Sequence, residues 1–177
     1  MNVTLCGLPG CGKSSVGQAL AQKGDLTFID IDLLIQAIYQ SQGNKFLNCQ
    51  EIFAFHGEVF FRQLEKEAIA SLVHSQDNII ASGGGAFMQE PNRKVFKSIG
   101  KVIYLKGPLK LIFDRLTRNR LPAYLDPQHP FKSFEALAAK RCPIYETVAD
   151  YIFDMHTLTS DEIASRLLEL LSLSKRR

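Results

Sequence analysis

The chain alternates short apolar runs with longer stretches in which apolar residues recur at helical spacing. Short apolar runs are typical of strands buried in a parallel sheet, and the longer pattern is typical of helices that bury one face. The pattern predicts strands at residues 3–6, 26–30, 78–82, 101–105 and 151–153. It predicts helices after the first strand and at residues 33–42, 51–55, 57–74, 91–99, 108–118 and 133–148, and a last helix from residue 160.

This alternation predicts an α/β fold, a five-stranded parallel sheet with helices on both faces. Ligands of such sheets bind beyond the carboxyl ends of the strands, so residues at those ends are the first candidates for a site. Residues 119–132 contain three of the seven prolines and show little periodicity. A loop of that length is typical of a lid over an active site.

Composition and charge narrow the class of protein. The 177 residues are 46% hydrophobic and 22% charged, as expected of a single globular domain over residues 1–177. The net charge of +3 is spread along the chain apart from residues 175–177, which we expect to form a solvated helix end, so nucleic-acid binding has little support. No apolar run is long enough for a membrane span, and the first strand starts too early for a leader, so we expect a cytoplasmic protein without membrane contact.

The cysteines do not suggest a metal or disulfide framework. Cys6, Cys11, Cys49 and Cys142 form no C-x-x-C pair and fall in strand, loop and helix contexts. Free thiols in a reducing compartment are therefore expected.

A phosphate-binding motif carries the strongest chemical signal. Residues 7–14 fit the pattern G-x-x-x-x-G-K-[ST] and lie between an apolar strand and an amphipathic helix. Glycines let backbone N–H groups curl around phosphate oxygens, Lys13 can neutralise the β and γ oxygens, and Ser14 can offer a hydroxyl to Mg²⁺. The motif predicts a nucleoside-triphosphate site.

Other strand ends carry further candidates, each with an ordinary structural alternative. Asp30 ends the second strand and Asp32 follows two residues later. One of them could serve a metal and the other an acceptor hydroxyl, or both could cap a helix. The glycines at 83–85 could admit a ligand to the main chain, or could form a flexible turn. Arg62 could bind an anion, or could be a solvated or ion-paired helix residue.

Five segments together resemble the shikimate kinase family, in its order and near its spacings, from about Asn2 to Asp154. They are the phosphate loop, residues 28–32, G-E-x-x-F-R-x-x-E at 57–65, S-G-G-G-A at 82–86, and the K-R-x-P-x-Y string within 139–145. The resemblance implies the strand order 2-3-1-4-5 and a phosphoryl transfer from ATP to the 3-hydroxyl of shikimate, a step of aromatic amino acid biosynthesis. It also implies Mg²⁺ as cofactor, and we expect a monomer.

The resemblance also implies roles for individual residues. The substrate-binding region is expected at about residues 32–62, and the residues that would contact the acceptor are Asp32, Arg62, Gly84, Gly85 and Arg141. The residues that would bind ATP are Gly10, Cys11, Gly12, Lys13, Ser14, Ser15, Arg115 and Arg120. The magnesium ligands would be Ser14 and Asp30, and the catalytic residues Asp32, Lys13 and Arg120. Because Leu121 separates Arg120 from Pro122, Arg118 is the alternative lid arginine.

Other phosphate-loop proteins are the rival interpretations. Gluconate kinases and nucleoside-monophosphate kinases share the loop, the size and the lid, but Arg62, the triple glycine and Arg141 favour shikimate. A GTP-dependent switch would carry D-x-x-G and N-K-x-D motifs. Neither motif occurs, since Asn44 and Lys45 are followed by Phe46 and Leu47.

Overall fold

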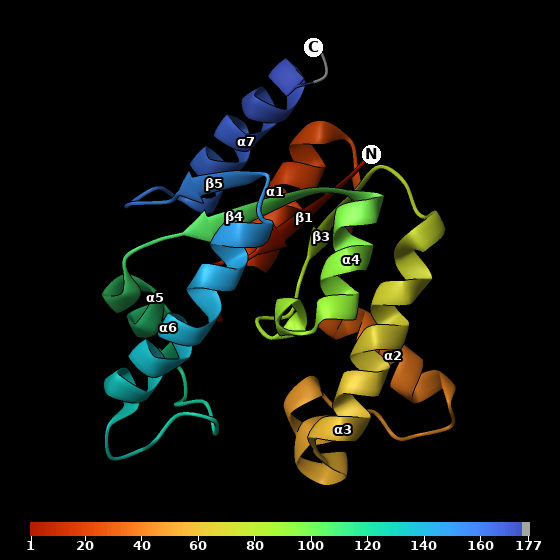
Figure 1. Cartoon of the computed structure of the whole chain (residues 1–177), viewed down its shortest axis with the longest axis vertical. Helices are drawn as coiled ribbons and strands as arrows, with labels where there is room; N and C mark the ends of the chain where they lie inside the picture. The colour runs from red at the N-terminus through yellow and green to blue at the C-terminus, as the bar shows by residue number, and fades with distance from the viewer. Residues whose placement is uncertain (175–177) are drawn as a thin grey trace.

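A computed structural model describes residues 1–174, so the helix end predicted at 175–177 lies outside the described residues. One sheet of parallel strands forms the centre of the molecule, in the order β2-β3-β1-β4-β5 (Figure 1). The strands are β1 (Asn2–Cys6), β2 (Thr27–Asp30), β3 (Asn78–Ala81), β4 (Gly100–Lys106) and β5 (Tyr151–Asp154). The α/β fold and the strand order are both as predicted.

Burial explains why these short runs form strands. Every residue of β1 and β3 is buried, because helices cover both faces of the sheet. β1 is central and pairs with β3 through Val3 and Ile79 and with β4 through Thr4 and Val102. Since all strands run in the same direction, their carboxyl ends lie along one edge.

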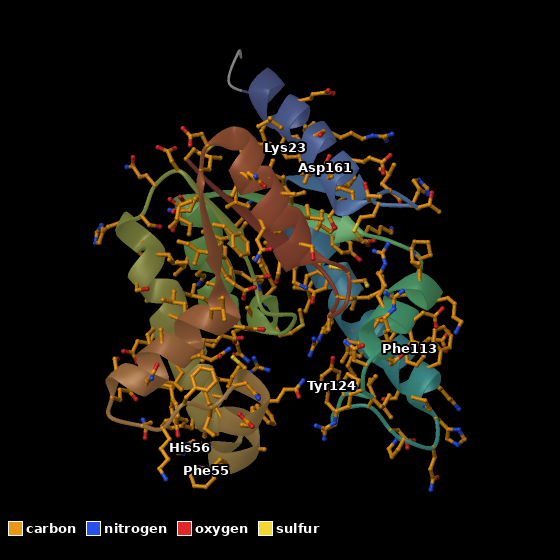
Figure 2. The ribbon with its side chains drawn as sticks, turned by 180° about the vertical axis from the view of Figure 1, so that it is seen from behind. Lys23, Phe55, His56, Phe113, Tyr124 and Asp161 are labelled. Atoms are coloured by element: carbon orange, nitrogen blue, oxygen red, sulfur yellow. The ribbon has the colours of Figure 1, made fainter. Side chains whose placement is uncertain are left out.

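The helices form a layer on each face of the sheet. Their bounds are α1 (Lys13–Gly24), α2 (Ile31–Ser41), α3 (Cys49–Ala70), α4 (Glu90–Ile99), α5 (Leu109–Thr117), α6 (Pro130–Val148) and α7 (Ser160–Ser174), with short 3₁₀ helices η1 (Ser71–His74) and η2 (Ala86–Met88). Figure 1 shows α4 and α6 in front of the sheet, and Figure 2 shows α1 and α7 on the opposite face. Among residues 1–174 no helix is long and apolar enough to cross a membrane.

The structure confirms one predicted boundary and shifts another. α3 spans Cys49–Ala70, but Gly57 leaves the helical conformation at φ 80° and ψ 176°, so two helical stretches meet there at a kink, as predicted. α6 begins at Pro130 rather than at residue 133, because proline fits the first turn of a helix and does not have to end the preceding loop. The irregular segment therefore spans residues 118–129 rather than 119–132.

Candidate active site

The phosphate loop joins β1 to α1 in a conformation that depends on glycine. Gly10 and Gly12 have φ values of 83° and 95°, which favour residues without a Cβ atom. A Cβ at Gly10 would also lie 2.7 Å from Leu116 Cβ, so α5 packs directly against the loop. Gly12 caps α1 without a side-chain bond, which leaves the first N–H groups of the helix directed at the loop. Such an arrangement favours an anion.

Lys13 places its charge inside this loop. Its side chain is buried, and Nζ donates hydrogen bonds of 3.0 Å to the carbonyl oxygens of Gly7 and Leu8. The buried Cys11 thiol lies 3.8 Å from the same ammonium group. A buried ammonium with only neutral partners is poised to accept an anionic one, because a charge-assisted bond is stronger than a bond to a carbonyl.

Asp30 connects the phosphate loop to α2. Ser14 Oγ donates a 2.6 Å hydrogen bond to one Asp30 oxygen, and the N–H of Asp32 donates to the other at 3.0 Å. Asp30 is therefore the N-cap of α2, so the capping alternative holds for this residue. Asp32 lies inside the helix, and its carboxylate is not the cap. The hydroxyl of Ser14 and the carboxylate of Asp30 are hard oxygen ligands of the kind that Mg²⁺ prefers.

The described residues contain no group of three or more His, Cys, Asp or Glu side chains that could enclose a metal. In the usual magnesium site of a nucleotide enzyme, one or two protein oxygens act together with phosphates and water. The donor pair of Ser14 and Asp30 fits that kind of site.

Asp32 is a carboxylate with an altered proton affinity. One side of its side chain is exposed to solvent, while the surrounding protein reduces the solvation of the rest. This loss of solvation, and then the charge of Asp30, raise the pKa of Asp32 above its ordinary value, whereas Lys13 lowers it. A Cβ at Gly83 would lie 3.0 Å from Asp32 Oδ1, so the carboxylate sits directly against the glycine segment that follows β3. A raised pKa suits a group that accepts a proton from a hydroxyl.

Arg62 approaches the glycine segment from α3. A Cβ at Gly85 would lie 3.0 Å from both Nη atoms of Arg62. Nη1 donates a 2.9 Å hydrogen bond to Glu65, and Nε lies 3.5 Å from an oxygen of Glu58. The guanidinium is thus an ion-paired group, as its structural alternative expects, and it also faces the main chain at which a ligand would bind.

Glu65 is a member of this site to which the sequence analysis assigns no role. It is only 2% exposed, and burial raises its pKa although Arg62 lowers it. The buried amide of Asn92 lies 3.5 Å from the same carboxylate oxygen. A signal was present, because Glu65 is the last residue of the G-E-x-x-F-R-x-x-E motif and lies one helical turn after Arg62.

Arg141 approaches the same segment from α6. Its Nη1 donates a 2.8 Å hydrogen bond to the carbonyl oxygen of Gly84. A Cβ at Gly84 would lie 2.8 Å from Pro9 in the phosphate loop and 3.3 Å from Arg141 Nη1. Glycine is therefore required at this point for a steric reason, and the phosphate loop, the glycine segment and α6 meet there.

The remaining predicted residues lie toward α5 and the segment 118–129. Arg115, Arg118 and Arg120 are exposed, and none forms an ion pair with another described residue. α5 lies against the phosphate loop through Leu116, which brings the helix of Arg115 near the loop. Ser15 is exposed in the first turn of α1. The structure thus brings six predicted side chains together with the two loops: Lys13, Ser14, Asp30, Asp32, Arg62 and Arg141. Arg118 and Arg120 are exposed, and no ion pair joins them to these residues within the described part of the chain.

Comparisons with known proteins agree with this geometry. A family model described as "Shikimate kinase" matches residues 9–172. The shikimate kinase of Thermodesulfovibrio yellowstonii is 33% identical over 168 residues, which cover 95% of this chain and 93% of that protein. The shikimate kinase of Chromobacterium violaceum is 35% identical over 170 residues, covering 96% of this chain and 89% of the relative.

Solved structures lead to the same family. A shikimate kinase from Acinetobacter baumannii, in complex with shikimate, superposes with a TM-score of 0.88 at 31% identity, covering 99% of this chain and 95% of that one. A gluconokinase from Sinorhizobium meliloti has a TM-score of only 0.52 at 18% identity, covering 98% and 96%, and so shares the fold alone. From its sequence, its fold and the residues gathered at its strand ends, the chain belongs to the shikimate kinase family.

Proposed function

We propose that the protein transfers the γ-phosphoryl group of ATP to the 3-hydroxyl of shikimate, giving shikimate 3-phosphate and ADP. The observation that carries this proposal is the convergence of Arg62 and Arg141 on the glycine segment. Arg141 Nη1 lies 2.8 Å from the carbonyl oxygen of Gly84, and a Cβ at Gly85 would lie 3.0 Å from both Nη atoms of Arg62. Two planar guanidinium groups select a carboxylate-bearing acceptor over a neutral one.

ATP would bind at the opposite side of the glycine segment. Its phosphates would take N–H groups of the loop at Gly10, Cys11, Gly12 and Ser15, and Lys13 would exchange its carbonyl partners for phosphate oxygens. Mg²⁺ would be held by Ser14, with Asp30 reaching it through water. When bound, this ion would neutralise negative charge on the phosphates.

Asp32 would receive the proton of the attacking hydroxyl. Its position against Gly83 and near the charge of Asp30 supports this role. A positioned base of this kind typically contributes about 10²- to 10⁴-fold to the rate. The remainder of the catalysis would come from positioning and charge neutralisation by Lys13 and the lid.

The segment 118–129 would act as the lid and supply one arginine to the transferring phosphoryl group, either Arg120 or the alternative Arg118. Arg115 on α5 would lie at the adenine side. The substrate-binding region would extend over about residues 32–62. We propose that the chain acts as a monomer in the cytoplasm.

Two substitutions test the proposal. Lys13→Ala should lower kcat with shikimate about 100-fold or more, because it removes charge neutralisation at the phosphates. Arg141→Ala should raise the KM for shikimate about tenfold or more and leave the KM for ATP nearly unchanged, because a charged hydrogen bond to the acceptor is lost.

Arg166→Ala is the matched control, because Arg166 is exposed on α7, far along the chain from every candidate residue. Its kinetic constants should equal those of the wild-type protein. Full activity toward shikimate in Arg141→Ala would contradict the assigned role of Arg141.

A further inference from the structure

The carbonyl oxygen of Gly84 accepts hydrogen bonds from two side chains of α6. Arg141 Nη1 donates at 2.8 Å, and the hydroxyl of Tyr145 donates at 2.5 Å. The two donors are four residues apart, so they lie on the same face of α6 one turn from each other. A single backbone oxygen beside the candidate acceptor site is therefore held by two groups at once.

Fixing this oxygen also fixes the N–H group of the following residue. The carbonyl of Gly84 and the N–H of Gly85 belong to one peptide unit, and the chain contains no cis peptide bond. In a trans peptide the two groups point in opposite directions. Because the carbonyl faces α6, the N–H of Gly85 faces away from α6, and within residues 1–174 it donates to no protein acceptor.

Tyr145 is the more permanent of the two donors. Its ring is fully buried and packs at 5.3 Å from the ring of Tyr104 and 6.3 Å from that of Phe87. Burial raises the pKa of Tyr145, so the hydroxyl keeps its proton and remains a donor. Arg141 lies at the edge of the site and has other N–H groups that a carboxylate ligand could engage. Tyr145 has a single hydroxyl proton, which is given to Gly84.

We infer that Tyr145 is a positioning residue for the acceptor, because its hydroxyl holds the Gly84–Gly85 peptide so that the N–H of Gly85 donates to an oxygen of the bound substrate. This inference rests on the proposed function. Tyr145 does not touch the acceptor, and it acts only through the orientation of one peptide group. Because both residues are glycines, this peptide group rotates easily unless it is held. The hydrogen bond from the buried Tyr145 restricts its orientation.

The test compares two hydroxyl deletions within the same aromatic cluster. Tyr145→Phe keeps the buried ring and removes only the donor to Gly84. Tyr104→Phe is the matched control, because it removes a buried hydroxyl from a ring 5.3 Å away that contributes no hydrogen bond to Gly84. We expect Tyr145→Phe to raise the KM for shikimate about three- to tenfold, the effect of one hydrogen bond, with the KM for ATP unchanged. Tyr104→Phe should leave both constants unchanged.

The outcomes separate this inference from the proposed function. A wild-type protein that does not phosphorylate shikimate would overturn both. An active wild-type protein with an unchanged KM for shikimate in Tyr145→Phe would overturn the inference alone, as would equal rises in the KM for ATP and for shikimate, which indicate a structural role.

If Tyr145→Phe fails to fold, the wild-type protein still allows a test. The amide signal of Gly85 in a ¹H–¹⁵N spectrum should shift on addition of shikimate, and an unchanged signal would overturn the inference.

Discussion

At the scale of single residues, two aspartates two positions apart have different environments. Asp30 uses one oxygen for the N–H of Asp32 and the other for the hydroxyl of Ser14, so its carboxylate is fully engaged. The carboxylate of Asp32 has no hydrogen-bond partner among residues 1–174 and lies against Gly83, where loss of solvation raises its pKa. The same residue type is therefore fixed by two hydrogen bonds at one position and has a raised pKa at the other.

The raised pKa of Asp32 predicts a pH dependence. An acid with a raised pKa is protonated over a wider pH range, so kcat/KM for shikimate should fall as the pH decreases through a value above 3.8, the ordinary pKa of aspartate. Asp32→Asn should lower kcat about 100-fold or more and abolish this fall in kcat/KM at acid pH, the acid limb of the profile. Steady-state rates measured between neutral and acid pH test both statements.

Asp161→Asn provides the control for this experiment. Asp161 is an exposed carboxylate paired with Lys23 at 2.9 Å, on the helices α7 and α1 (Figure 2). Its substitution should leave the rate and the pH profile as in the wild-type protein. An unaltered acid limb in Asp32→Asn would mean that another group is the base.

The candidate residues were predictable from sequence where a motif specifies both the residue and its role. Lys13 and Ser14 follow from the phosphate loop alone, whereas Arg62 and Arg141 needed a family resemblance, because a lone arginine is usually a surface residue. Glu65 and Tyr145 were quoted within motifs but given no role. The partner of Glu65 is Arg62, one helical turn earlier, so the motif contained a signal for it. The partner of Tyr145 is Gly84, 61 residues away, and it becomes visible only in the folded chain.

At the scale of elements, α3 is built to place Arg62. Its first turn is fixed by a capping box between Asn48 and Glu51, and the helix then bends at Gly57. The ring of His56, just before the bend, stacks on that of Phe60 with centroids 4.3 Å apart, and its Nε2 forms a 2.8 Å hydrogen bond with the hydroxyl of Tyr39 on α2. The second part of the helix therefore leaves the bend in a defined direction.

We expect Gly57→Ala to disturb this direction. A side chain at φ 80° and ψ 176° costs about 1–3 kcal/mol, because this backbone region is essentially restricted to glycine. The variant should lose that much stability in urea denaturation and should show a raised KM for shikimate, since Arg62 follows the bend.

Ala54→Gly serves as the comparison for Gly57→Ala. It lies in the first part of α3 and should lose about 1 kcal/mol of stability through backbone freedom, with an unchanged KM for shikimate. Equal stability of Gly57→Ala and the wild-type protein would contradict the strained bend.

The types of the elements were predictable because apolar residues follow different spacings in buried strands and in helices that bury one face. The ends of the elements were less predictable. Pro127 and Pro130 both suggested loop, yet Pro130 opens α6, since the first turn of a helix needs no N–H from that residue. The break at Gly57 was predictable, and the structure confirms it as a kink between two helical stretches.

At the scale of the whole molecule, the parallel sheet gathers segments distant in sequence at one edge. Because β2, β3 and β1 are adjacent strands, three features at their carboxyl ends are neighbours: the loop after β1, Asp30 at the end of β2, and the glycines after β3. Figure 1 shows α2 and α3 on one side of this edge, and α5 with the segment 118–129 on the other. The alternation of strands and helices predicted this architecture, but the strand order depended on the resemblance, because several orders satisfy the same pattern.

The identity of the phosphoryl acceptor separates shikimate kinases from other phosphate-loop kinases. ADP release from MgATP by the purified protein measures it. Shikimate, gluconate and AMP should be offered separately, beside a blank without acceptor. We predict ADP release above the blank with shikimate alone, because shikimate combines a carboxylate for Arg62 and Arg141 with a hydroxyl for Asp32 on one rigid ring. Gluconate carries its carboxylate on an open chain, and AMP carries no carboxylate. Release with gluconate or AMP, or none above the blank with shikimate, would contradict the account.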